Sequence, residues 1–244
     1  MEGSIVQKSK AKLVLVLVIG LLSLFFLLIL SWSMGAVDID ISKVVDSMSY
    51  IITNFGPMGG DAEQQIVWSR MVRSVAVVGV GIGLSVSGVV MQALIRNPLV
   101  DPYITGVSSG AALGAILSIL AGISIVSLAE YTTPVAALIG ALAAFFITLT
   151  LAESAGGRSI NFVLSGMIIG IAISSITTVL IVSSDDNRLH GALFWLYGSF
   201  AYMSWTKALI IIIPILILAV VFMLYAREFN VILLGDEHAK HLGL

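Results

Sequence analysis

Long stretches without a charged side chain recur along this chain, separated by short charged segments. A helix that crosses a membrane needs about 20 apolar residues, or about 30 Å at 1.5 Å per residue. Stretches free of Asp, Glu, Lys and Arg that meet this length occur six times: Leu13–Val37, Ser74–Ile95, Pro102–Ala129, Tyr131–Ala152, Ser159–Ser184 and Ala208–Ala226. The pattern predicts an all-α membrane protein, a polytopic transmembrane helix bundle, in which residues 1–244 form a single transmembrane domain.

One further uncharged stretch, Leu189–Thr206, is separated from the last predicted span only by Lys207, which leaves no room for a turn between antiparallel helices. The stretch is rich in aromatic residues, and Trp and Tyr prefer the membrane–water interface. We interpret it as an interfacial helix leading into the sixth span, with a seventh span as the alternative.

The distribution of lysines predicts the orientation. Lys8, Lys10 and Lys12 precede the first span, and no basic residue follows until Lys43. Basic residues favour the cytoplasmic side, so we expect a cytoplasmic N-terminus, and six spans return the C-terminus to that side. A cleaved signal peptide is the alternative, but the first uncharged run is longer than a usual signal core and no clear Ala-x-Ala site follows. We therefore expect a retained helix.

The longest predicted loop, Asp38–Arg73, lies on the outer side in this topology. Within it, Ile39–Ile52 is predicted to form a short surface helix. The sequence Asn-Phe-Gly-Pro-Met-Gly-Gly at residues 54–60 indicates a turn or a flexible stretch.

Small residues recur every four positions in four consecutive predicted spans. Apolar attraction between helices is weak in lipid, so close backbone contact must supply their association, and we expect a tightly packed bundle. The stripes comprise Gly79, Gly83 and Ser87; Gly106, Gly110 and Gly114; Ala136, Gly140 and Ala144; and Gly166, Gly170 and Ser174.

Composition agrees with a membrane protein and excludes several functions. Of 244 residues, 59% are hydrophobic and 11% charged, whereas soluble domains carry about 25% charged residues. The net charge of −2 gives no basic excess for binding nucleic acid. The absence of cysteine excludes disulfides, thiolate metal sites and iron–sulfur clusters.

Nucleotide-binding signatures are also missing. The run Gly79-Val-Gly81-Ile-Gly83 superficially resembles a dinucleotide loop, but it lies inside an uncharged span and no strand precedes it. No Gly-x-x-x-x-Gly-Lys-Ser/Thr loop occurs in the chain. If ATP drives this protein, we expect another chain to bind it.

The segment from Gln92 to Ala111 has the most constrained residue choice. Its prolines can stop one helix and allow another to start, while Asn97 and Asp101 can bond freed backbone groups. An ordinary cytoplasmic turn is the alternative interpretation. The helix-connecting motif predicted here comprises Gln92, Arg96, Asn97, Pro98, Asp101, Pro102, Gly106, Ser108, Ser109 and Gly110.

This segment resembles the Arg-Asn-Pro-Leu-x-Asp-Pro-x-x-x-Gly-x-Ser-Ser-Gly-Ala motif of FecCD-type permeases, the membrane subunits of ABC importers for iron-siderophores, haem and vitamin B12. Two further elements are similar to that family: Phe-Trp-Leu-Tyr-Gly-Ser at 194–199, and Leu-Gly-Asp-Glu-His-Ala-Lys-His-Leu-Gly at 234–243. The family's Arg-x-Pro-Arg element is Arg70-Met-Val-Arg73 here, without the proline. Family members have about ten helices, so the resemblance covers about the first six.

The resemblance implies a type II ABC importer permease in the cell (inner) membrane. Its partners would be a second permease copy, cytoplasmic ABC ATPases and an extracytoplasmic substrate-binding protein. Arg70 and Arg73 would dock acidic residues of the binding protein, with anchoring to lipid headgroups as the alternative. The cytoplasmic segment 227–244 would contact the ATPase through Gly235, Glu237, Ala239, Leu242 and Gly243.

The resemblance further implies that the fifth span lines the translocation pathway. The same hydroxyl groups could instead bond within their own helix or to neighbouring helices. The candidate lining residues are Ser165, Ser174, Ser175 and Thr178, with Thr177 beside them.

Other function classes fit the sequence less well. The predicted spans carry no Asp, Glu, Lys, Arg or His, which argues against a proton- or sodium-driven carrier and against an intramembrane enzyme. His190 falls in a loop, and a metal pair at His238 and His241 is less favoured than an exposed turn. We therefore expect no catalytic residue, metal or cofactor.

A non-transporting fragment, or one half of a split permease, remains the alternative function. The sequence does not identify the substrate.

Overall fold

The computed structural model describes residues 2–54, 56, 61–123, 130–233 and 235, and every regular element among them is helical. The all-α prediction is confirmed. The chain divides into two compact units, each formed by two segments. The first unit contains Met1–Val80 and Phe200–Pro214, and the second contains Gly81–Ser199 and Ile215–Leu244.

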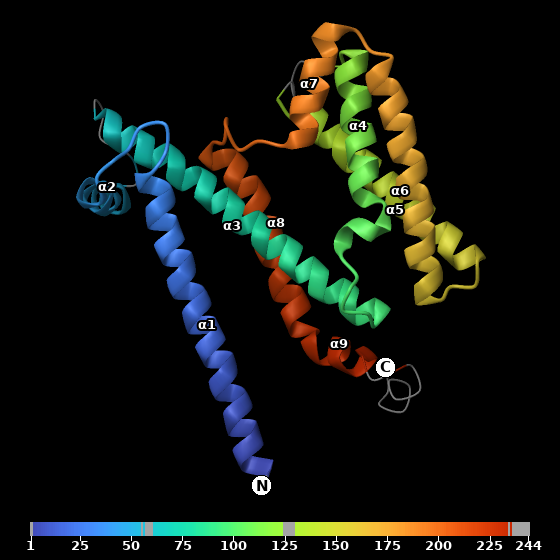
Figure 1. The fold of residues 1–244 in the computed structure, drawn as a ribbon, viewed down its shortest axis with the longest axis horizontal. Coiled ribbons are helices and arrows are strands. Elements are labelled where there is room, and N and C mark those ends of the chain that lie inside the picture. The colour runs from blue at the N-terminus through green and yellow to red at the C-terminus, as the bar shows by residue number, and fades with distance from the viewer. Residues whose placement is uncertain (1, 55, 57–60, 124–129, 234, 236–244) are drawn as a thin grey trace. The chain divides into compact units, whose positions relative to one another are not determined.

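The first unit is built from α1 (Glu2–Ser33), α2 (Ile41–Asn54), the first part of α3 (Ala62–Ile95) and the start of α8 (Trp205–Leu224). Its helices meet where α1 ends. Figure 1 shows α2 almost end-on beside that end, whereas α1 runs in the plane of the picture. The core there comprises Trp32, Ile39, Val44, Ile51 and Val67.

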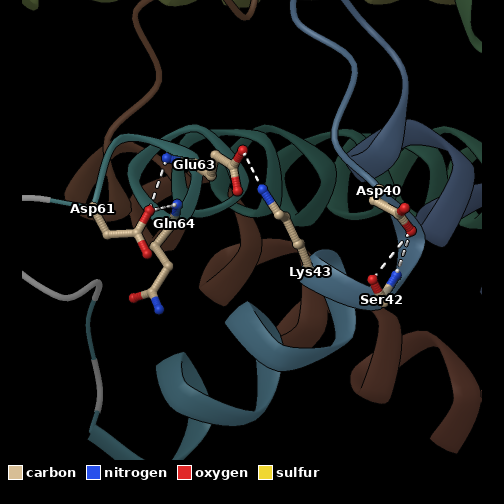
Figure 2. Close-up of polar contacts among 6 residues, drawn as sticks. All are labelled: Asp40, Ser42, Lys43, Asp61, Glu63 and Gln64. Carbon is tan, nitrogen blue, oxygen red and sulfur yellow. Dashed lines mark hydrogen bonds and ion pairs between the residues drawn. The ribbon is translucent and has the colours of Figure 1, made fainter.

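Helix α3 begins at Ala62, although the sequence predicted its span from Ser74. Asp61 precedes the helix, and its carboxylate accepts hydrogen bonds from the backbone N–H groups of Glu63 and Gln64, at 3.0 and 3.1 Å (Figure 2). A carboxylate at this position satisfies N–H groups that the first turn of a helix leaves free. Arg70 and Arg73 therefore lie on a helix and not in the predicted loop.

The second unit contains a bundle of helices around α4 (Val107–Ala121). The 3₁₀ turn η1 (Pro102–Thr105) leads into α4, which packs against its neighbours α5, α6 and α7. Figure 1 shows α4, α6 and α7 side by side. These neighbours are α5 (Thr132–Ser154), α6 (Ser159–Val182) and α7 (Asp186–Tyr197). The unit also contains α9 (Ala226–Leu233) and the remaining parts of α3 and α8.

Glycines bring α4 and α5 into backbone contact. A Cβ atom added to Gly110 would meet the carbonyl oxygen of Gly140 and the Cβ of Ala144. A Cβ added to Gly114 would meet the carbonyl oxygen of Ala136. In lipid, this close approach is what holds helices together. The tight packing predicted from the small-residue stripes is confirmed for this pair.

Among the described helices, α1, α3, α5, α6 and α8 are long and apolar enough to cross a membrane. The predicted stretch 102–129 differs, because η1 and α4 divide it and residues 124–129 lie outside the described part. Gly106 and Gly122 bound α4 with φ angles of 77° and 65°, in the left-handed region that ends a helix. The 15 residues of α4 rise about 22 Å, less than the bilayer core.

The aromatic stretch 189–206 contains the end of α7, whose last residue is Tyr197, and a non-helical connection to α8. Trp205 begins α8 and stacks at a tilt on Trp68 of α3, with ring centroids 5.0 Å apart. The predicted helix therefore ends at Tyr197, and a non-helical segment leads into the next span. A place for this stretch at the membrane interface remains a prediction.

Candidate functional site

The predicted connection between α3 and η1 is a turn held by its own side chains. Helix α3 ends at Ile95, and Arg96 takes a left-handed conformation with φ 56°. The Asn97 N–H then donates back to the Gln92 carbonyl at 3.3 Å. The Gln92 side-chain amide donates to the carbonyl of Pro98 at 3.1 Å. Gln92 therefore ties the end of the helix to the chain that leaves it.

Asn97 and Asp101 satisfy backbone donors, as their sequence context predicted. The Asn97 side-chain oxygen accepts from the Leu99 N–H at 2.9 Å. One Asp101 carboxylate oxygen accepts from the N–H groups of Tyr103 and Ile104, at 2.9 and 3.2 Å. Pro102 begins η1, where its missing N–H costs nothing.

The cap at Asp101 gives a testable expectation. Substitution Asp101→Ala removes the acceptor of two N–H groups and should lower stability by about 1 kcal/mol. Asp101→Asn keeps a side-chain oxygen and should retain most of that stability. Thermal unfolding of the detergent-solubilised chain measures the difference, and equal melting of the two variants would contradict this role.

The motif continues into α4 and contacts α5 and α6. A Cβ at Gly106 would lie 3.2 Å from the carbonyl oxygen of Gly166, so only glycine fits without displacing α6. The Ser109 hydroxyl lies 3.1 Å from that of Ser174 on α6, whereas Ser108 is exposed. Sequence reasoning missed Thr148 of α5, whose buried hydroxyl donates to the Thr105 carbonyl at 3.1 Å.

The candidate pathway hydroxyls on α6 do not share one environment. Ser165 is buried, whereas Ser175 and Thr178 are exposed within this chain. The hydroxyls of Ser175 and Thr178 each donate at 2.9 Å to a carbonyl one turn earlier in α6, as does that of Thr177. Among the predicted lining residues, Ser174 is the one that a side-chain hydrogen bond joins to the connecting motif.

Arg70 is hydrogen-bonded to the C-terminal end of α1 and the loop that follows it. Its Nη1 donates to the carbonyls of Trp32 and Ser33 at 2.7 and 3.1 Å, and its Nη2 donates to the carbonyl of Val37 at 2.6 Å. A Cβ on Gly35 would lie 2.6 Å from Nη2, so a larger residue there would displace the guanidinium. Because the last carbonyls of a helix have no partners within it, Arg70 caps α1 from α3.

Arg73 differs from Arg70. It is exposed, and its guanidinium makes one hydrogen bond, Nη2 to the carbonyl of Ala201 at 3.2 Å. Among the described residues, the Arg73 guanidinium has no second hydrogen-bond partner. Of the predicted pair, Arg73 is therefore the arginine whose charge is available to a docking partner.

The predicted ATPase-contacting residues fall largely outside the described part of the chain. Gly235 is described, with a φ angle of 107°, where a side chain would be strained. Glu237, Ala239, Leu242 and Gly243 lie outside the described residues, and so do His238 and His241. The part of 227–244 that is described is mostly α9, so ATPase contact remains a prediction.

The apolar helices, their backbone-close crossings and the capped connection together define a multi-pass helical membrane protein of the transporter-permease class. The family model for the FecCD transport family matches residues 21–244. The chain belongs to the FecCD transport family.

Three of its relatives are permeases that import different substrates. It is 32% identical to the Fe(3+)-citrate import system permease YfmD of Bacillus subtilis, over 100% of this chain and 69% of YfmD. It is 39% identical to the hemin transport permease HmuU of Yersinia pestis, over 72% of this chain and 53% of HmuU. It is 35% identical to the molybdate import permease MolB of Haemophilus influenzae, over 53% of MolB.

A solved structure also matches the fold. An inward-facing metal-chelate type ABC transporter superposes with a TM-score of 0.75 at 28% identity, covering 91% of this chain and 66% of that one. The chain thus spans between about half and two thirds of the length of the relatives it matches.

Proposed function

We propose that this chain is the transmembrane permease subunit, or part of one, of an ATP-driven importer for an iron-siderophore, haem, cobalamin or a related metal chelate. The observation that carries the proposal is the connection from Gln92 to Gly110. Its family-like sequence forms a capped turn and a glycine contact between helices. The likeness to a metal-chelate transporter over 91% of the chain supports the same reading.

The partners follow from the same proposal. ATP would be hydrolysed by cytoplasmic ABC ATPase subunits, because this sequence contains no phosphate-binding loop. The segment 227–244 would contact them, and a second permease copy would complete the pathway across the cell membrane. A short element at this place can convert closure of the ATPase into rigid-body movement of helices.

The hydrogen-bonded pair of Ser109 and Ser174 supports a polar path beside α4 and α6. Their hydroxyls lie 3.1 Å apart, and Ser174 is exposed within this chain. Ser175 and Thr178 present their side chains nearby on α6, with their hydroxyl hydrogens already used within the helix. Such groups still offer lone pairs to water or cargo.

A non-transporting fragment or one half of a split permease is the second candidate. It is favoured by the share of its relatives that the chain spans, 69% of YfmD and 53% of HmuU. The two candidates differ in whether the chain can assemble a working pathway.

Co-purification with a co-expressed ABC ATPase subunit, followed by uptake of radioactive ferric citrate, haemin or cobalamin, separates the two. Stable assembly with uptake of one of these compounds is the expected result for the permease. A chain that inserts into membranes but neither retains the ATPase nor supports uptake would reject the permease proposal and favour the fragment.

Docking of the substrate-binding protein is proposed to use Arg73 in particular. Arg73→Glu reverses an exposed charge, so stimulation of ATPase activity by the binding protein should fall at least about tenfold, as loss of a charge-assisted contact predicts. Arg73→Lys keeps the charge and serves as the control. Stimulation that is unchanged in Arg73→Glu would exclude this docking role.

A further inference from the structure

Helix α2 exposes one apolar edge and one polar face. Ile41, Val45 and Ile52 are 51%, 52% and 63% exposed. At 100° per residue these positions fall within about 40° of one another around the helix. The exposed side chains of Ser42 and Asp46 lie about 80° and 120° around the helix from the middle of this edge.

The neighbouring edge of α2 is firmly packed. Val44 and Ile51 are 0% and 3% exposed and belong to one core cluster with Trp32 of α1 and Val67 of α3. The Lys43 ammonium also pairs with the Glu63 carboxylate at 2.7 Å (Figure 2). The direction in which the edge of Ile41, Val45 and Ile52 points is therefore fixed by contacts to α1 and α3.

The depth of α2 follows from the length of α1. Lys12 and Trp32 are 20 residues apart, which corresponds to about 30 Å of helix and to the thickness of the hydrocarbon core. If Lys12 marks one boundary, Trp32 marks the other. Because α2 packs on Trp32 and crosses α1 steeply (Figure 1), these boundaries would place it along the membrane surface.

Apolar side chains are also exposed on α1 and in the connection to α2. Residues of α1 such as Phe25 and Phe26 are 59% and 61% exposed, as expected for a helix that faces lipid. Met34 and Val37, in the connection that follows, are 64% and 50% exposed. The exposed edge of α2 therefore follows a segment that itself exposes apolar side chains.

We propose that α2 is an interfacial anchor, with Ile41, Val45 and Ile52 inserted at the boundary between headgroups and acyl chains and Asp46 facing water. A helix with one apolar and one charged face takes this position in a bilayer. Three side chains are too few for a stable protein interface, which buries about 800 Å² on each partner. Lipid accepts an edge of this size, since its binding needs no shape complementarity.

The absence of cysteine from the chain allows a direct test. Single variants Val45→Cys and Ile52→Cys, with Asp46→Cys as the matched control, would each be labelled with an environment-sensitive fluorophore. The full chain would be placed in vesicles of phosphatidylcholine and phosphatidylglycerol. Spin-labelled lipid then probes contact with the acyl region, and iodide probes contact with water.

Labels at positions 45 and 52 should show blue-shifted emission and quenching by spin-labelled lipid at least about threefold stronger than the label at 46. The label at 46 should be quenched by iodide. Strong iodide quenching at 45 and 52 would overturn the proposal, and so would protection of both positions from both quenchers, which would mean that protein covers this edge. Ile41→Cys provides a repeat measurement should either variant fail to give a single gel-filtration peak.

Discussion

Gly110→Ala should destabilise the protein by about 2–3 kcal/mol, the upper part of the range for overpacking a filled site. The added methyl group would meet the backbone carbonyl of Gly140 and the Cβ of Ala144. Neither atom is the end of a flexible side chain, so the two helices must separate. Loss of their contact removes the dispersion that holds them in lipid. A melting temperature lowered by about 5–10 °C in detergent would be the measured result.

Gly88→Ala is the matched control for Gly110→Ala. Gly88 also lies inside a helix, α3, but a Cβ there meets nothing within 4 Å. Alanine favours a helix over glycine by about 1 kcal/mol, so this variant should keep or raise the melting temperature. Equal losses in the two variants would show that the crossing of α4 and α5 does not decide the outcome.

Arg70→Gln is expected to loosen the joint between α1 and α3, with a loss of about 2–4 kcal/mol. The guanidinium supplies donors to the carbonyls of Trp32, Ser33 and Val37. Hydrogen bonds to a charged group contribute about 1.5–3 kcal/mol each, and bonds that share one group do not add fully. Thermal unfolding, together with protease cleavage between α1 and α2, measures the effect.

Arg73→Gln is the control for the Arg70 variant, since it removes an exposed arginine three residues along the same helix. Arg73 makes one backbone hydrogen bond, so the loss should stay below about 1 kcal/mol. If both variants unfold alike, the capping role of Arg70 is wrong. If Arg70→Gln is stable but unresponsive to a binding protein, docking becomes the better account of Arg70.

The uncharged stretches of the sequence predicted most of the helices but not all of their ends. The second uncharged stretch begins after Arg73, whereas helix α3 already begins at Ala62. Arg70 is tolerated there because its partners are carbonyls 33 to 38 residues earlier in the chain. No local pattern reveals partners so distant. Gly106 and Gly122 were missed as the bounds of α4 because a left-handed backbone leaves no mark in hydrophobicity.

The connecting motif was the best-predicted part of the candidate site. Asn97 and Asp101 cap backbone N–H groups within three residues of themselves, so their role was readable from local sequence. The contact of Ser109 with Ser174 crosses 65 residues and depends on how α4 and α6 pack. Small residues predicted that helices approach closely, but not that Gly110 faces Gly140. Docking by Arg73 and ATPase contact by 227–244 stay predictions.

Two of the polar contacts that hold α3 to its neighbours respond differently to the medium. The guanidinium of Arg70 donates to backbone carbonyls, which do not titrate. Lys43 is exposed, and its hydrogen bond to Glu63 raises its pKa above the ordinary 10.5. That contribution is complete below pH 10.5 and fades as the pH rises through the higher folded value. Salt weakens it as well. Alkaline, salty buffers therefore weaken the Lys43–Glu63 pair selectively, while Val44 and Ile51 keep α2 packed on α1 and α3.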